Sequence, residues 1–295
     1  MVHVQLARMA PAVNGLTGLA RVMEFIDAIS LNMYRRSSRE RWPMNWLFNL
    51  ESRRMAIYEQ KLVSSFDRQI VSSPSDREAI GNYETLHIVP NGVNIEDFPY
   101  NKDGGASNII IFTGRMGYFP NADAAVYFAT KVLPLIQRRE PNVRFVIVGA
   151  DPPRRVRMLS RISGVEVTGY VPNIQDYMAR ATVAVAPLQA ATGIQNKVLE
   201  AMASGIPIVA TPNALEGIDA VNGEHLLVAE DANLLAEKVL QLLKDPILRR
   251  RLARNARQLV EEKYTWERSV EILEKVYRMA IYRSSERKKR VLHPG

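Results

Sequence analysis

The chain has 295 residues, of which 47% are hydrophobic, and a formal net charge of +8 from 39 basic and 31 acidic side chains. This length and hydrophobic content fit a globular protein of two domains, or of one domain and part of another. The sequence has no cysteine, which excludes disulfides, thiolate catalysis and cysteine zinc sites, and its four histidines are scattered. The basic balance leaves nucleic acid, an anionic membrane face and acidic substrates as candidate partners.

No apolar run approaches the length that spans a bilayer, and the N-terminus lacks the pattern of a signal peptide. We therefore expect a cytoplasmic protein. Aromatic residues do not interleave with the arginines, so no nucleic-acid partner is expected.

The first hundred residues predict a small α/β unit. Short apolar runs predict four strands, at Val2–Leu6, Arg21–Ile26, Gln69–Ser72 and Leu86–Val89. Between them, Pro11–Gly18 is loop-like and Asn32–Arg41 is polar and rich in arginine. Helical spacing predicts a helix over Trp46–Ser64, and Ser73 is a candidate cap for a short helix over Pro74–Glu78.

A turn signal and a polar stretch separate this unit from the rest. Pro90-Asn-Gly-Val-Asn follows a predicted strand, and Tyr100–Asn108 contains Gly104-Gly105. We place the boundary near residues 95–106. The predicted division is a first domain over 1–100, a second over 101–264 and a C-terminal segment over 265–295.

The second domain alternates strands with helices. Strands are predicted at Ile109–Thr113, Val143–Val148, Val165–Thr168, Thr182–Ala186, Ile206–Ala210 and His225–Val228. Helices are predicted at about Ala122–Gln137, Pro153–Ile162, Ile174–Ala181, Gln195–Ser204 and Ala232–Leu243. This order predicts a doubly wound parallel sheet, whose binding sites gather at the carboxyl ends of the strands.

Val183–Thr211 is the most informative stretch, because a strand, a glycine-bearing loop, a helix and a second strand follow one another. A helix N-terminus after a parallel strand attracts anions, and Lys197 adds a positive charge there. Asn196 and Glu200 share a helix face one turn apart. The pattern favours a nucleotide diphosphate with its ribose beside Glu200. The alternative is an ordinary βαβ unit with solvated polar residues.

Gly193-Ile-Gln-Asn-Lys-Val-Leu-Glu-Ala-Met-Ala-Ser-Gly-Ile-Pro-Ile-Val-Ala-Thr resembles the donor-binding signature of retaining glycosyltransferases of family 4, which have the GT-B fold. The similarity is greatest to the bacterial exopolysaccharide sugar transferases of that family. The family shows a pair of glutamates here. The second matches Glu200, which implies a ribose contact, and the first falls on Thr192, so that carboxylate is missing.

Two further loops fit the resemblance. Thr113-Gly-Arg-Met-Gly matches the first donor loop, which implies that Arg115 binds the diphosphate; a surface salt bridge is the alternative. Asn121 stands near the place of a phosphate-binding lysine, and we favour a role for it as cap of the helix starting at Ala122. Gly169-Tyr-Val-Pro-Asn matches the loop that reads the donor base, where Tyr170 stacks on the base or belongs to the core or rim.

The resemblance thus implies donor contacts from a set of loop and helix residues: Gly114, Arg115, Asn121, Gly169, Tyr170, Val171, Thr192, Gly193, Ile194, Gln195, Asn196, Lys197 and Glu200. It implies catalysis without a metal or another cofactor, with Arg115 and Lys197 neutralising the leaving diphosphate. At the strand end where the family often has a histidine, this chain has Asp27. Asp27 then acts on the acceptor hydroxyl or the sugar, or it only caps the segment after the strand.

The resemblance also bears on the ends of the chain. Family members carry further residues before the point matching Met1, so we expect an incomplete N-terminal Rossmann-like domain beside a complete C-terminal one. The spacing of Trp266, Val270, Leu273, Tyr277 and Ala280 predicts an amphipathic helix, which the resemblance places back on the first domain. Arg287-Lys-Lys-Arg reads as a disordered tail, either solvated or in contact with anionic lipid at the inner membrane face.

The expected function is transfer of a sugar, with retention, from a nucleotide-diphosphate sugar to a glycan or lipid-linked acceptor in exopolysaccharide or cell-surface glycan synthesis. The alternative is a non-catalytic fragment that binds the nucleotide-sugar. A Gly-x-Gly-x-x-Gly fingerprint does not follow Ile109–Thr113, which disfavours a nicotinamide-dependent oxidoreductase.

Overall fold

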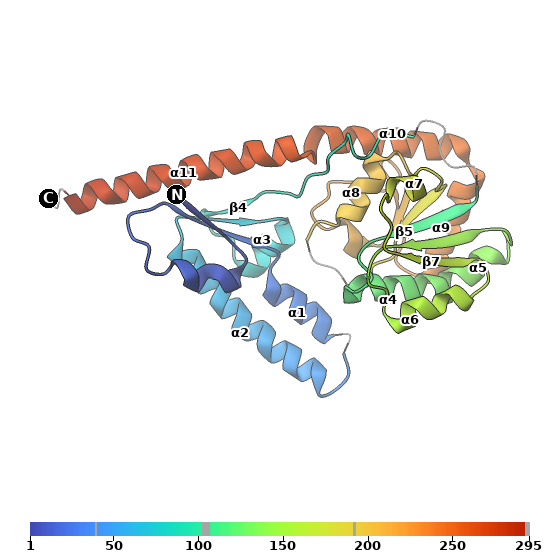
Figure 1. The fold of residues 1–295 in the computed structure, drawn as a ribbon, viewed down its shortest axis with the longest axis horizontal. Helices are drawn as coiled ribbons and strands as arrows, with labels where there is room; N and C mark the ends of the chain where they lie inside the picture. The colour runs from blue at the N-terminus through green and yellow to red at the C-terminus, as the bar shows by residue number, and fades with distance from the viewer. Residues whose placement is uncertain (39, 102–106, 191–192, 293–295) are drawn as a thin grey trace. The chain divides into compact units, whose positions relative to one another are not determined.

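The computed structural model describes residues 1–38, 40–101, 107–190 and 193–292, with the backbone alone described from 288 onward. The chain forms two compact units (Figure 1). Unit 1 comprises Met1–Asn91 and the segment from Trp266 onward, and Gly193 and Ile194 are grouped with it. Unit 2 comprises Gly92–Ala191 and Gln195–Thr265.

Unit 1 is built on a four-stranded parallel sheet. Its strands lie in the order β1 (Val2–Gln5), β2 (Arg21–Ile26), β3 (Arg68–Val71) and β4 (Leu86–Ile88). Each strand starts and ends within one residue of its predicted bounds, because short runs of buried apolar residues mark them clearly in the sequence. The core against the sheet includes Met23, Phe25 and Leu86.

The helices of unit 1 differ more from the prediction. A 3₁₀ segment at Ala7–Val13 replaces part of the expected loop, and α1 (Ile29–Ser37) runs through most of the stretch read only as polar and basic. Its polarity hid the helix, since α1 buries few of its side chains. α2 (Met44–Ser65) and α3 (Pro74–Ile80) are present, and the Ser73 hydroxyl accepts a hydrogen bond from Asp76 N at 3.2 Å, which confirms the predicted cap.

The C-terminal helix α11 (Trp266–Leu292) packs on β2 and β3 of unit 1, as the resemblance implies for the last helix. Val276 and Ala280 share an apolar cluster with Val22 and Ile70. The expected disordered tail is wrong at its start, because the helical backbone continues through residues 287–290 to Leu292. Residues 293–295 lie outside the described residues.

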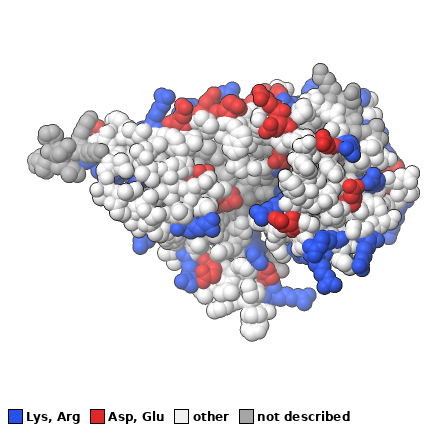
Figure 2. Space-filling view, viewed as in Figure 1, with Lys and Arg blue, Asp and Glu red and all other residues white. Residues whose placement is uncertain are grey.

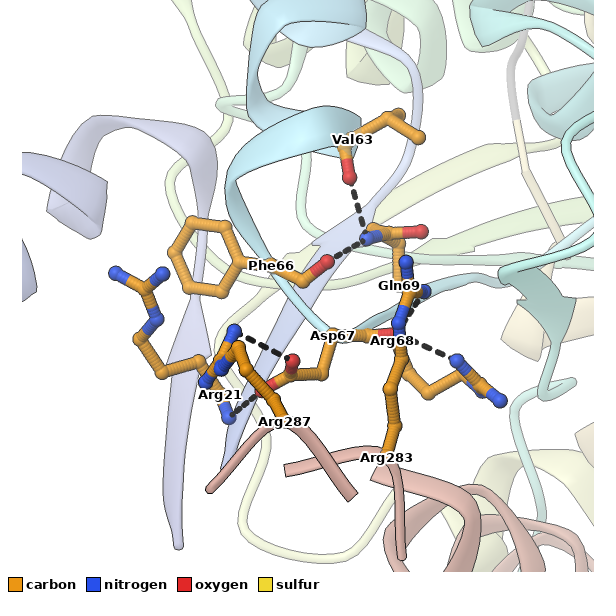
Figure 3. Close-up of polar contacts among 8 residues, drawn as sticks. All are labelled: Arg21, Val63, Phe66, Asp67, Arg68, Gln69, Arg283 and Arg287. Carbon is orange, nitrogen blue, oxygen red and sulfur yellow. Dashed lines mark hydrogen bonds and ion pairs between the residues drawn. The ribbon is translucent and has the colours of Figure 1, made fainter. Parts of the chain in front are cut away.

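A buried carboxylate fastens α11 to the sheet (Figure 3). Asp67 is 3% exposed and accepts hydrogen bonds from the Arg287 guanidinium at 3.1 Å and from Arg21 N at 2.9 Å. Arg283 and Arg68 donate to the Asp67 carbonyl at 3.2 and 2.7 Å. The helix terminus is therefore held by charge-assisted hydrogen bonds in addition to apolar packing.

Unit 2 contains a six-stranded parallel sheet. Its strands are β5 (Ile109–Thr113), β6 (Arg144–Val148), β7 (Val165–Gly169), β8 (Val183–Ala186), β9 (Ile208–Ala210) and β10 (Leu227–Val228). They lie in the order β10-β9-β8-β5-β6-β7, and every pair is parallel. The predicted doubly wound parallel sheet is confirmed. The chain moves outward in one direction from β5 to β7 and in the other from β8 to β10.

The helices of unit 2 are α4 (Phe119–Tyr127), α5 (Leu133–Gln137), α6 (Arg154–Arg157), α7 (Gln175–Met178), α8 (Asn196–Ala203), α9 (Ala232–Lys244) and α10 (Pro246–Lys263). The single helix expected over Ala122–Gln137 is interrupted by a π-helical segment at Phe128–Val132. Pro134, which has no N–H and crowds the preceding turn, is the second residue after that segment. Short 3₁₀ segments occur at Met158–Arg161 and Pro212–Leu215.

Among the residues that the structure describes, no helix combines the length and apolar character needed to cross a bilayer.

Candidate nucleotide-binding site

The predicted donor residues of unit 2 converge where the strand order of its sheet reverses. β5 and β8 are neighbours, and successive strands proceed away from each of them. In open parallel sheets this arrangement leaves a crevice at the carboxyl ends of the two strands, where ligands bind. Gly114 and Arg115 follow β5, and the loop into α8 follows β8.

Three glycines form a row across the carboxyl ends of β5, β6 and β7. Gly114, Gly149 and Gly169 have φ values of 144°, 153° and 71°. Gly149 N donates to the Gly169 carbonyl at 3.1 Å, and a Cβ atom on Gly149 would lie 1.8 Å from the Gly114 carbonyl oxygen. Only residues without a side chain allow this close approach, so partly buried backbone, with no side chains over it, forms the floor of the crevice.

Gly114, Asn121 and Lys197 are brought together although they lie on different elements. A Cβ atom on Gly114 would be 2.8 Å from Asn121 Nδ2 and 3.2 Å from Lys197 Cε. The proposed cap role of Asn121 is wrong, because α4 begins at Phe119 with Tyr118 as its N-cap. Asn121 lies inside the first turn, and its side chain donates to the Arg115 carbonyl at 3.0 Å. It thereby fixes the loop that carries Arg115.

Lys197 lies in the first turn of α8 and is partly buried. Its ammonium donates to Gln195 Oε1 at 3.1 Å. Desolvation lowers the pKa of Lys197 from 10.5 to about 8, and the Glu200 carboxylate opposes this shift. A cation at a helix N-terminus is unfavourable by itself. An anion bound there would stabilise both the ammonium and the helix end.

Glu200 lies one turn further along α8, on the same face as Asn196. Burial raises the pKa of Glu200, and Lys197 opposes the shift. Gln195 is 8% exposed and is the N-cap residue of α8, but its side chain makes no capping bond. These side chains offer a cation, a carboxylate and amides at one helix end.

Arg115 forms the surface salt bridge that the sequence analysis gave as the alternative to diphosphate binding, with a partner, Asp151, that was not predicted. Its Nε donates to Asp151 Oδ2 at 2.9 Å, and the two side chains are 76% and 59% exposed. Asp151 follows β6 and has a φ of 55°, a left-handed conformation that is uncommon for aspartate. The sequence signal was the run Gly149-Ala-Asp at a strand end. This exposed pair contributes little to stability, but it orients the guanidinium.

The remaining predicted donor residues are placed as follows. Tyr170 is 77% exposed directly after β7, which excludes the core for its ring, and Val171 is partly buried. Gly193 has a φ of 67°, and Ile194 is 6% exposed. Thr192 lies outside the described residues. In the described part of the chain, no group of three or more histidine, aspartate or glutamate side chains is placed to hold a metal ion.

Asp27 belongs to unit 1 and follows β2 directly. Its carboxylate accepts a hydrogen bond from the Ser72 hydroxyl at 3.2 Å. Desolvation and the nearby Asp76 carboxylate raise the pKa of Asp27 from 3.8 to about 6. Ile26, the preceding residue, has a φ of 68°, a strained value for a β-branched side chain.

The alternative role of Asp27, capping the segment after the strand, is not what the structure shows. Two buried carboxylates accept hydrogen bonds from the backbone N–H groups at the start of α1 instead. Asp76 Oδ1 accepts from Ala28 N at 2.9 Å, and Glu59 Oε1 accepts from Ser30 N at 3.3 Å. Both acids are fully buried, and the sequence reading missed them because α2 and α3 deliver them across the fold.

Comparisons with known proteins bear on the fold and on the family resemblance. Residues 107–245 match the family described as Glycosyl transferases group 1. A relative from Klebsiella pneumoniae, an uncharacterized 44.6 kDa protein in the cps region, is 23% identical over 211 residues, covering 68% of this chain and 53% of its own length. The chain thus spans about half the length of the curated relatives it matches.

Solved structures share the fold. TarM from S. aureus superposes with a TM-score of 0.74 at 20% identity, over 94% of this chain and 54% of TarM. HepE from Anabaena, solved with UDP-glucose, gives a TM-score of 0.68 at 15% identity, over 94% of this chain and 77% of HepE. Residues 107–245 are thus similar to the group 1 glycosyltransferases, and the two parallel sheets and the solved structures show that the chain has the GT-B fold.

Proposed function

We propose that this chain binds a nucleotide-diphosphate sugar at the β5/β8 crevice of unit 2. It acts as a glycosyltransferase that moves the sugar, with retention, to a glycan or lipid-linked acceptor. The observation that carries the proposal is the convergence of Gly114, Asn121 and Lys197 at the point where the strand order reverses. Backbone with no side chains over it and a desolvated ammonium at a helix N-terminus suit a diphosphate.

Each part of the donor has a counterpart in the crevice. The diphosphate would lie between the Gly114 backbone and the start of α8, with Lys197 and Arg115 as its cations. Glu200 would accept hydrogen bonds from the ribose hydroxyls, and the loop at Tyr170 would face the base. The solved HepE complex contains UDP-glucose, which makes a uridine nucleotide the first ligand to test.

Catalysis in this proposal rests on the charge that develops on the leaving diphosphate. As the bond from the anomeric carbon to the diphosphate oxygen breaks, Lys197, Arg115 and the N–H groups of α8 would stabilise the departing negative charge. This route needs no metal, which stays a prediction. Asp27 would accept the proton of the acceptor hydroxyl or orient that hydroxyl.

The similarity of this chain to the protein from the Klebsiella cps region supports a biological role in exopolysaccharide or cell-surface glycan synthesis. The competing proposal is a protein that binds the nucleotide-sugar without transferring it. One measurement distinguishes the two proposals. Only a transferase releases nucleoside diphosphate from the nucleotide-sugar when an acceptor is present.

Calorimetric titration with UDP, GDP, pyrophosphate and phosphate tests the binding site. Arg115→Ala should weaken nucleoside diphosphate binding by about 1.5–3 kcal/mol, the range for a charge-assisted hydrogen bond. Glu200→Gln should weaken binding of the nucleotide but leave pyrophosphate binding nearly unchanged, because only the nucleotide carries ribose. Lys131→Met, which removes an exposed lysine of unit 2 away from these loops, is the matched control. Equal affinities in all four proteins would reject the assignment.

A further inference from the structure

The end of unit 1 where α1 meets α2 carries an exposed aromatic cluster. Trp42 is 81% exposed, Trp46 63% and Tyr34 59%, and Met44 and Leu47 are each 42% exposed. We call the segment from Tyr34 to Arg54 the α1–α2 tip. In Figure 1 the two helices run away from the sheet of unit 1 and end together at this tip. An exposed apolar patch of this kind marks an interaction surface.

The α1–α2 tip is also strongly basic. Six arginines and two glutamates fall within residues 34–54, so this stretch holds half of the formal net charge of +8. Among the described residues, Arg36 pairs with Glu40 at 3.2 Å and Arg54 with Glu51 at 2.8 Å. Figure 2 shows uncharged side chains at the lower end of the molecule, with both basic and acidic side chains directly above it.

A groove between the two helices completes the surface. Its lining combines Tyr34, Trp42 and Trp46 with Asn45, Asn49 and Arg53. Aromatic rings whose polar edges face water, beside arginines on long apolar stems, are the side chains that favour the boundary between lipid head groups and acyl chains. A soluble anionic partner would satisfy the arginines but leave the tryptophans exposed.

From this combination we propose that the α1–α2 tip docks on an anionic lipid bilayer. Trp42 and Trp46 enter the head-group region, and Arg41 and Arg53, which are both exposed, contact lipid phosphates. The inference goes beyond the proposed function and does not rest on it, because it uses only unit 1. It also moves the membrane contact expected for the C-terminal tail to a different element, since Arg287 at the start of that tail is paired with Asp67.

The chain provides its own probe for this docking. It has three tryptophans, and two of them lie in the α1–α2 tip. In the Trp266→Phe protein, all tryptophan emission comes from Trp42 and Trp46. Vesicles of phosphatidylglycerol and phosphatidylcholine should shift this emission to the blue, and lipids brominated near the head group should quench it. Vesicles of phosphatidylcholine alone should bind at least tenfold more weakly.

Flotation with the same vesicles compares variants of the tip with matched control variants. Trp42→Ser with Trp46→Ser should abolish flotation, while Trp266→Phe, which changes the third and 48% exposed tryptophan, should float like the wild type. Arg41→Gln with Arg53→Gln should weaken binding to anionic vesicles roughly twenty-five-fold, at about fivefold per arginine. Arg138→Gln with Arg139→Gln in unit 2 should leave it unchanged.

Three outcomes would overturn the proposal. The first is flotation that survives the loss of both tip tryptophans, in a variant whose melting temperature shows that it is folded. The second is quenching of the tip tryptophans by a soluble oligosaccharide with no binding to anionic vesicles. The third is a concentration-dependent dimer that the tryptophan substitutions dissolve, again without vesicle binding.

Discussion

At the scale of single residues, the site depends on charged groups kept in unfavourable surroundings. Lys197 has its pKa lowered to about 8 by desolvation, and Asp27 has its pKa raised to about 6 by desolvation and by Asp76. Burial of ionisable groups without full compensation costs stability, and perturbed groups of this kind gather at functional sites.

The first prediction concerns the pH dependence of nucleotide binding. Well below pH 8 the Lys197 ammonium is already charged, so the affinity for UDP should be nearly constant up to about pH 7 and roughly twofold lower at pH 8. As pH rises further, the free protein loses this proton and must take it up again on binding. The affinity should then fall by up to about tenfold per pH unit.

Calorimetry from pH 7 to 9.5 in buffers of different ionisation enthalpy measures both the affinity and the proton uptake. In Lys197→Met the affinity should be low and independent of pH over this range. A wild-type affinity that stays constant up to pH 9.5 would show that Lys197 does not contact the ligand.

The second prediction concerns stability at Asp27. Its pKa is higher in the folded protein than the ordinary value of 3.8, so the folded state prefers the protonated acid. The contribution of Asp27 to stability is therefore greatest below pH 3.8 and is lost as pH rises through about 6. Asp27→Asn should stabilise the protein at pH 7 by about 1–3 kcal/mol, the scale of a shift of two pKa units.

Urea unfolding of the wild type and Asp27→Asn at pH 4, 5, 6 and 7 measures this difference. The gain in the variant should grow with pH and level off above pH 6. A gain that is equal at every pH, or a loss at pH 7, would contradict the assigned surroundings of Asp27.

At the scale of elements, the strands were predicted well and the polar helices poorly. β2 and β5 have the expected bounds, because an uninterrupted apolar run specifies a buried parallel strand. α1 was missed because its arginines face solvent and give little apolar periodicity. Residues 287–290 were read as a disordered tail from their charge, but they lie in α11, and the pairing of Arg287 with Asp67 supports a helix there.

The third prediction concerns the anchor of α11. Asp67→Ala removes a buried acceptor and leaves Arg21 N and the Arg287 guanidinium without that partner. We expect a loss of about 2 kcal/mol in the free energy of unfolding, because a buried donor remains unsatisfied. Thermal denaturation followed by circular dichroism measures it.

Asp219→Ala is the matched control for this experiment. It also breaks an aspartate ion pair, with Lys263 at 2.8 Å, but both side chains are exposed, at 66% and 51%. Its effect should be much smaller than that of Asp67→Ala, because exposed ion pairs contribute little to stability. Equal effects of the two substitutions would mean that the buried Asp67 contacts do not hold α11.

At the scale of the whole molecule, sequence reasoning reached the fold and the resemblance to group 1 glycosyltransferases, and it named loop residues that the structure brings together in unit 2. It missed Asp151, Glu59 and Asp76, which become neighbours of Arg115, Ser30 and Ala28 only after the chain folds. It also gave Asn121 a cap role, because the start of α4 at Phe119 depends on the turn at Tyr118 rather than on a polar cap. The loop motifs can be recognised in the sequence, whereas the residues that contact them only after folding cannot.

Hydrogen–deuterium exchange with and without saturating UDP tests the central claim most directly, because it locates the nucleotide on the chain. Binding at the β5/β8 crevice should slow exchange in peptides covering 113–121 and 195–204, where Gly114, Arg115 and the N-terminus of α8 lie. Peptides covering 138–144, at the opposite ends of the strands, should be unchanged. Protection confined to other peptides, or none under conditions where calorimetry shows UDP bound, would contradict the account.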